Sequence, residues 1–167
     1  MTVYFPQNDG DYRVYVKGRA RGLNATWTDS VKQVADGYVH TNYWGDGIER
    51  RVSVDADGNV REGKALWYRL SQGAVAWQLQ LEVDGPPCVD GSQVRIVSDD
   101  ETVEVPAGKF ENCLLLEFEN NCLDAGVLKQ WFAPGVGLVK QLEDSIAGPV
   151  AVELTSAVVG GVKYPKE

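Results

Sequence analysis

The stretch that decides the fold runs from Val103 to Lys140 and reads VEVPAGKFENCLLLEFENNCLDAGVLKQWFAPGVGLVK. It contains two apolar runs of strand length, one preceded by Pro-Ala-Gly and the other followed by Ala-Pro-Gly-Val-Gly. Because proline fixes φ and glycine permits positive φ, both punctuating segments favour tight turns or bulges between strands. Large residues stand beside small ones, as a sheet corner requires. The residues to which we assign this structural role are Pro106, Gly108, Phe110, Pro134, Gly135 and Gly137.

Outside this stretch the chain shows the same alternation of short apolar runs and turn signals. Residues 12–17 alternate, with Tyr12, Val14 and Val16 on one face, which indicates a half-buried strand. Residues 74–83 alternate most clearly, with Val75 and Trp77 on the same apolar face. Gly45-Asp46-Gly47, residues 55–59 and Ser71-Gln72-Gly73 read as turns.

These patterns predict an all-β fold of about eleven antiparallel strands in a meander, with at most one short helix. We expect a curved open sheet or half-open barrel, and a two-sheet sandwich is the alternative. The 167 residues fit a single β domain, with an ordered core over about residues 3–159 and a short C-terminal tail beginning at Gly160-Gly161.

The motif resembles that of an uncharacterised group of bacterial domains, often found in exported or lipid-anchored proteins. The group's pattern runs V-x-V-P-A-G-x-F, then an apolar strand, then an aromatic pair followed by A-P-G-V-G-x-V-K. This chain matches it at Val103–Phe110 and Trp131–Lys140. The resemblance implies a curved antiparallel sheet, distantly similar to the half-open barrels of lipoprotein carriers, and a periplasmic or cell-envelope location. It implies no catalytic residues.

Composition and charge exclude several classes of protein. The net charge is -8, with 24 acidic and 16 basic residues and no basic cluster, which argues against nucleic-acid binding. No apolar run approaches the roughly 20 residues of a transmembrane segment. The first residues show no positively charged region followed by an apolar run, so we expect no signal peptide in this chain.

Three cysteines and a single histidine predict no metal site and no cofactor. Cys113 and Cys122 could face each other across a hairpin and form a disulfide in an oxidising compartment. The alternative is that the cysteines are free thiols, since an odd count leaves at least one of them without an intramolecular partner.

Candidate chemistry in the sequence is sparse. His40 is conceivable as a general base, but no acid or nucleophile partner stands out. Residues 55–62 resemble a calcium loop, although their glycine lies at the fourth position and an Asp-Gly hairpin turn explains them better. The tryptophans either fill the core or, if the sheet is curved, form the wall of an apolar binding site. The candidate ligand-binding residues are His40, Trp44, Trp67, Trp77 and Trp131.

The leading hypothesis is a non-enzymatic protein that binds an apolar or amphipathic, lipid-like ligand on the concave face of its sheet. The alternative is a structural or interaction module of the bacterial cell envelope, whose partner is an envelope protein. A hydrolase with converging carboxylates is the third possibility.

Overall fold

The computed structural model describes residues 2–18, 25–71 and 76–166. These residues form thirteen strands and no helix. The strands are β1 (Tyr12–Lys17), β2 (Ala25–Val34), β3 (Gly37–His40), β4 (Arg50–Val54), β5 (Asn59–Glu62), β6 (Ala65–Arg69), β7 (Ala76–Gln78), β8 (Gln93–Val105), β9 (Gly108–Glu119), β10 (Val127–Ala133), β11 (Gly137–Glu143), β12 (Val150–Val159) and β13 (Val162–Tyr164).

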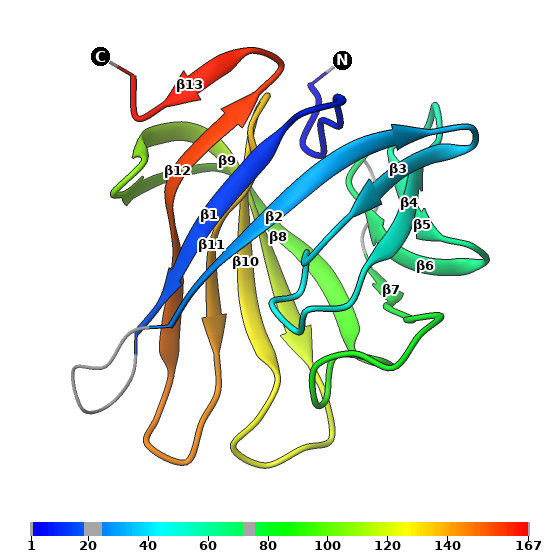
Figure 1. The fold of residues 1–167 in the computed structure, drawn as a ribbon. Helices are drawn as coiled ribbons and strands as arrows, with labels where there is room; N and C mark the ends of the chain where they lie inside the picture. The colour runs from blue at the N-terminus through cyan, green and yellow to red at the C-terminus, as the bar shows by residue number, and fades with distance from the viewer. Residues whose placement is uncertain (1, 19–24, 72–75, 167) are drawn as a thin grey trace.

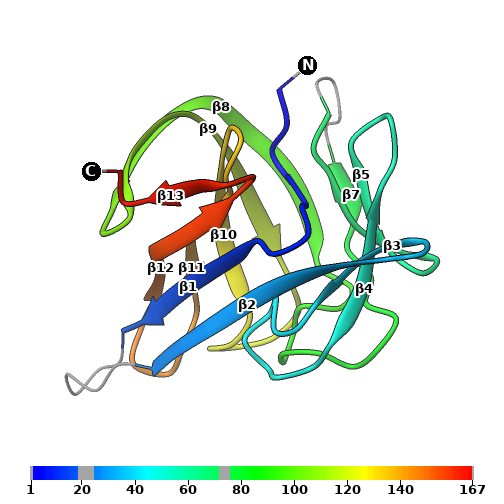
Figure 2. The same cartoon turned by 45° about the horizontal axis from the view of Figure 1, so that its top comes forward.

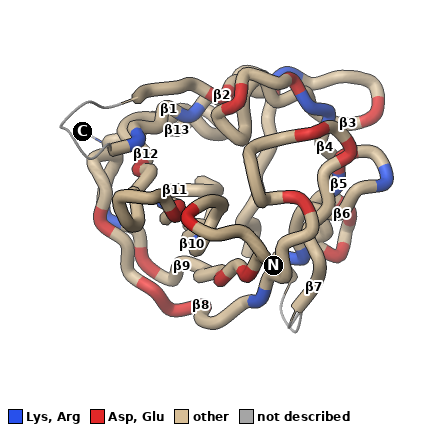
Figure 3. The backbone as a smooth tube through the Cα atoms, turned by 90° about the horizontal axis from the view of Figure 1, so that it is seen from below, with Lys and Arg blue, Asp and Glu red and all other residues tan. Residues whose placement is uncertain are grey.

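All strands belong to one antiparallel sheet, which curls into a nearly closed barrel (Figure 1). The order is β6-β5-β4-β3-β2-β1-β12-β11-β10-β9-β8-β7, with β13 paired to β12. Because β1 pairs with β12, the two free edges are β6 and β7, which follow each other in the chain. Seen from below, the strands surround the interior in this order, with acidic and basic residues interspersed along them (Figure 3).

The predicted all-β antiparallel fold is confirmed, and the barrel is more closed than a half-open one. Between the edge strands, the Gln80 amide donates to the Leu66 carbonyl oxygen at 2.8 Å. The Trp77 indole N–H donates to the Trp67 carbonyl oxygen at 2.9 Å. We refer to this line of contact between β6 and the segment from β7 onward as the seam.

Several element boundaries differ from the prediction. The acidic residues 99–101, whose composition is typical of a turn, lie inside β8, because irregular pairing with β9 lets the strand continue through them. Residues 162–164, predicted to belong to a tail, form β13 against β12. The β-rich run over residues 38–44 is a strand only as far as His40. The predicted turn at Ser71-Gln72-Gly73 and the position of Val75 lie in part or wholly outside the described residues.

The two punctuating segments of the decisive stretch lie in hairpin connections. Pro106 and Ala107 join β8 to β9, and Gly108 has a φ of 144°. Pro134 and Gly135 join β10 to β11, where Gly135 has a φ of 72° and Gly137 one of 102°. The β8–β9 connection is also bonded to β12, since the Ala107 amide donates to the Leu154 carbonyl oxygen.

The core is a continuous cluster inside the barrel, and it is rich in aromatic rings. Trp67, Tyr68 and Phe132 are fully buried. The Tyr43 and Tyr68 hydroxyls lie 3.0 Å apart, so these polar groups satisfy each other inside the core. Burial and this neighbouring hydroxyl raise the pKa of Tyr43 well above its ordinary value.

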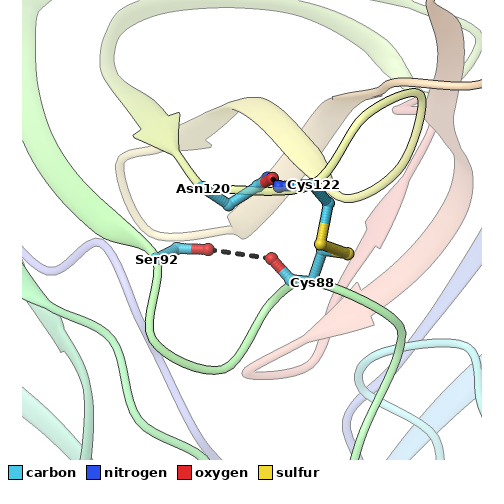
Figure 4. The surroundings of a disulfide bond; sticks show 4 residues. All are labelled: Cys88, Ser92, Asn120 and Cys122. Atoms are coloured by element: carbon cyan, nitrogen blue, oxygen red, sulfur yellow. Dashed lines mark hydrogen bonds between the residues drawn. A yellow bond between two sulfur atoms is a disulfide. The ribbon is translucent and has the colours of Figure 1, made fainter.

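One disulfide joins Cys88 to Cys122, with 34 residues of sequence separation (Figure 4). It connects the loop before β8 to the loop between β9 and β10, and the Ser92 hydroxyl donates to the Cys88 carbonyl oxygen beside it. The predicted Cys113–Cys122 pairing is wrong. Cys113 lies within β9 and points into the core as a free, fully buried thiol, whereas Cys122 lies in the exposed loop beyond the strand.

Candidate functional site

The candidate site lies at the end of the barrel that the N-terminal residues cross (Figure 2). Residues 3–8, which we call the strap, belong to no strand. The Val3 carbonyl oxygen accepts a hydrogen bond from the Gly135 amide at 2.8 Å, and the Tyr4 hydroxyl donates to the Asn112 carbonyl oxygen at 3.3 Å. The strap is therefore held to the barrel rim by a small number of bonds outside the sheet.

Phe5 is the apolar anchor of the strap. The residue is 7% exposed, and its ring reaches into the barrel mouth. The ring centroids of His40, Tyr43 and Tyr68 lie 5.7, 5.6 and 6.1 Å from that of Phe5. Aromatic rings at these separations form favourable contacts beyond simple burial. The mouth is thus an aromatic socket, and in this structure the chain's own phenylalanine fills it.

His40 connects the strap to the barrel wall. Its Nδ1 lies 2.7 Å from Asp29 Oδ2, and its Nε2 lies 2.7 Å from Gln7 Oε1. Asp29 is held in turn by the Asn42 amide, which donates to Oδ1 at 3.0 Å. Both ring nitrogens of His40 are therefore engaged in hydrogen bonds, Nδ1 with the barrel wall and Nε2 with the strap.

Arg13 is a buried cation beside this socket. It is 5% exposed, its Nε donates to the Val136 carbonyl oxygen at 2.9 Å, and its Nη2 donates to the Pro6 carbonyl oxygen at 3.2 Å. None of the ion pairs among the described residues includes Arg13. Asp29 is its cross-strand neighbour, but the Asp29 carboxylate is bonded to His40 and Asn42 instead. The guanidinium therefore bonds to neutral carbonyl groups.

The strap separates two spaces. On its inner side is a cavity of about 10 Å³, roughly the minimum for one water molecule, bordered by Arg13, His40 and Tyr43. On its outer side is an open groove of about 510 Å³. The groove is lined by Val3, Phe5, Pro6, Gln7, Asn8, Asp36, Gly37, Tyr38, Ser53 and Val54. Since Phe5 and Pro6 line both spaces, they form the wall between them.

The predicted site residues are buried rather than arranged around an open surface. His40, Trp44, Trp67 and Trp77 are 1, 7, 0 and 6% exposed. Trp44 and Trp67 contact each other, with ring centroids 5.3 Å apart. Among the described residues, the concave face is covered by the chain's own side chains, so these indoles offer no accessible concave binding surface. Trp131 is half-buried and lies beneath the Lys140 ammonium at 5.5 Å.

Sequence reasoning missed the residues that make the mouth distinctive: Phe5, Gln7, Arg13 and Asp29. The alternation in residues 12–17 did indicate that Arg13 and Tyr15 lie on the same face of the strand. In the structure that face is the buried one. No local pattern showed that the opening residues cross the barrel end, since this contact joins positions far apart in the chain.

Converging carboxylates occur at the seam, where they are engaged in structural bonds. Asp46 and Glu62 both pair with the fully buried Arg50, at 2.8 and 3.6 Å. Glu62 Oε1 also accepts hydrogen bonds from the Trp67 indole at 3.2 Å and the Glu82 amide at 3.1 Å. This arrangement engages both acids in bonds and links β4 and β5 to the segment after β7.

Other reactive groups are equally constrained. Burial, followed by the charge of Glu101, raises the pKa of the Cys113 thiol to about 11, which disfavours the nucleophilic thiolate. Within the described ranges, no three His, Cys, Asp or Glu side chains are placed to hold a metal ion.

No family model matches the sequence, and no curated protein matches it. Two solved structures resemble the chain. One is a candidate lipoprotein from Parabacteroides distasonis ATCC 8503, with 14% identity, a TM-score of 0.46, and coverage of 93% of this chain and 98% of that one. The other is a candidate exported protein with a YmcC-like fold from Bacteroides fragilis NCTC 9343, with 13% identity, a TM-score of 0.48, and coverage of 94% and 99%. Among the described residues, no helix is long and apolar enough to span a membrane.

Proposed function

We propose that this protein is a non-enzymatic binding module of the bacterial cell envelope that holds a small amphipathic molecule in the groove beside the strap. The observation that carries the proposal is the groove itself. Its volume of about 510 Å³ lies within the range of small-molecule sites. Val3, Tyr38 and Val54 supply apolar surface, and Gln7 and Ser53 supply polar groups along the same groove.

The disulfide supports the location. Disulfides form and persist in oxidising compartments, and Cys88–Cys122 joins two surface loops. A periplasmic or cell-envelope site, which the sequence motif implies, provides such an environment.

The groove differs from the concave-face site expected from the sequence. Aromatic side chains occupy the interior, so with the strap in place a ligand has access to the outer side of the strap and not to the barrel centre.

A second candidate function, an interaction module, is favoured by two exposed aliphatic side chains. Leu123 is 93% exposed and Ile146 is 91% exposed. They lie in the β9–β10 and β11–β12 loops, which Figure 1 shows at the end of the barrel away from both termini. Self-association that Leu123→Ser and Ile146→Ser abolish would favour this role over ligand binding.

The ligand-binding proposal is tested by extracting the purified protein with organic solvent and analysing the extract by mass spectrometry. Val54, 39% exposed, lines the groove, whereas Val97, 40% exposed, does not. We expect a stoichiometric amphipathic molecule from the wild type and from Val97→Arg, and its loss from Val54→Arg. Equal retention by both variants would place the ligand elsewhere. An empty extract together with no binding of added C12 amphiphiles would overturn the proposal.

A further inference from the structure

We infer that the strap covers a carboxylate-binding site, in which Arg13 and His40 receive the head group of an apolar acid whose hydrocarbon part takes the place of Phe5. The inference rests on the proposed function: the amphipathic molecule of the groove is an acid, and it enters the covered site next to the groove when the strap opens. In this structure the strap occupies the site in the manner of a tethered ligand.

The first argument is the state of Arg13. Buried charges in proteins are normally paired, since an isolated charge loses its hydration without compensation. The Arg13 guanidinium is 5% exposed and, among the described residues, is bonded only to the carbonyl oxygens of Val136 and Pro6. A planar guanidinium matches a carboxylate in geometry as well as charge. A carboxylate at the Pro6 oxygen position would supply the anion that the described residues do not place on Arg13.

The second argument is the pair of oxygens that the strap presents. The Pro6 carbonyl oxygen accepts from Arg13 Nη2 at 3.2 Å, and Gln7 Oε1 lies 2.7 Å from His40 Nε2. Arg13 and His40 line the same small cavity. A single carboxylate group carries two oxygen acceptors, one for the Arg13 guanidinium and one for His40 when its Nε2 carries a proton. The neighbouring Phe5 ring fills the aromatic socket, as the apolar part of an acid would.

The third argument concerns access. The cavity of about 10 Å³ is too small for a carboxylate while the strap is in place. Phe5 and Pro6 form the wall between this cavity and the outer groove, so outward movement of the strap joins the two spaces. The strap lies outside every strand, and such segments open at lower free energy than a sheet does. The ligand thus competes with a tethered segment, and its apparent affinity depends on how often the strap is open.

The test compares three probes that share a C12 chain: dodecanoate, dodecan-1-ol and dodecyltrimethylammonium. Their binding is measured by titration calorimetry below their micellar concentrations. We expect dodecanoate to bind at least about tenfold more tightly than the alcohol, with the cation weakest. In Phe5→Ala, which weakens strap closure, dodecanoate affinity should rise by about tenfold or more.

The head-group contact is tested with Arg13→Met. We expect its dodecanoate affinity to fall to that of dodecan-1-ol, with partial recovery in Arg13→Lys. Arg51→Met, at an exposed position on β4 outside the groove, is the matched control and should bind as the wild type does. Near-ultraviolet circular dichroism verifies that each variant is folded.

A measurement on the unsubstituted protein keeps the test valid if Arg13→Met fails to fold. His40 is the single histidine, so its ring resonances are identified without assignment. Dodecanoate should shift the Nε2 resonance, and dodecan-1-ol should leave it in place. Equal affinities for all three probes, with no shift at His40, would overturn the carboxylate site but leave groove binding intact. Absence of binding by every probe, in the wild type and in Phe5→Ala, would overturn both.

Discussion

At the scale of single residues, burial in this protein does not follow polarity alone. On β1 the inward positions hold Arg13 and Tyr15, whereas Val14 and Val16 are half-buried. Tyr15 is accommodated because its hydroxyl donates to the Leu138 carbonyl oxygen at 2.8 Å. Arg13 is accommodated by the carbonyl groups of the strap and of the β10–β11 turn. Two polar groups therefore enter the interior where the barrel end supplies acceptors.

The tryptophans divide into core and surface residues, and substitution distinguishes them. Trp67 is fully buried and its indole N–H bonds to Glu62, so Trp67→Ala should lower the free energy of unfolding by about 3–5 kcal/mol. Trp131 is half-buried beneath Lys140, and Trp131→Ala should cost about 1 kcal/mol. Urea unfolding with an unchanged m-value measures both, and equal losses would contradict the assignment of Trp67 to the core.

At the scale of elements, most neighbouring strands of the barrel are joined as hairpins. β8 and β9 pair over a long distance with three register shifts, and these irregularities allow the strands to curve around the barrel. The exposed acidic residues 99 and 100 are tolerated inside β8 because their side chains remain in solvent. A cluster of acids in the sequence therefore does not end a strand that has an exposed face.

Gly135 lies in the β10–β11 connection and Gly137 begins β11, and substitution of each glycine tests why the motif needs glycine at that position. Both have positive φ, so alanine at either position is strained by about 1–2 kcal/mol. A Cβ at Gly135 meets no atom within 4 Å, whereas one at Gly137 would lie 3.3 Å from the Arg13 guanidinium. We expect Gly137→Ala to be the more destabilising in thermal unfolding and to weaken dodecanoate binding. Gly135→Ala should leave that binding unchanged. The reverse order would contradict the packing of Arg13 on Gly137.

At the scale of the whole molecule, the pairing of β1 with β12 places the seam in the middle of the chain. Among the described residues, the seam is fastened by the hydrogen bond from the Gln80 amide to the Leu66 carbonyl oxygen, the Trp77 indole bond to Trp67 and the Arg50–Glu62 network. The Cys88–Cys122 disulfide then ties the segment following the seam to the neighbouring β9–β10 loop. The barrel is thus completed by local polar contacts and one covalent link.

Reduction of the disulfide should destabilise the whole barrel. Its loop spans 34 residues of sequence separation, for which loop-closure entropy gives a loss of about 3–4 kcal/mol. The reductant-treated wild type and the Cys88→Ala/Cys122→Ala variant should show the same lowered free energy of unfolding in urea. Reductant should have no further effect on the variant. An unchanged stability after verified reduction would contradict this contribution.

The sequence by itself determined the all-β class, the antiparallel meander and the positions of the main turns. These follow from alternation, proline and glycine, which act over a few neighbouring residues. The same local alternation predicted that Trp77 lies on a buried face.

Only the tertiary structure decided the β1–β12 pairing, the Cys88–Cys122 link, and the crossing of the barrel end by the strap. Each of these joins residues far apart in the chain, and the curvature of the closed sheet determines which of them meet. The candidate site depends on the same cause. Phe5, Arg13 and His40 are unremarkable in sequence, and they form a site because closure of the barrel brings an aromatic socket, a buried cation and a histidine together beneath one segment.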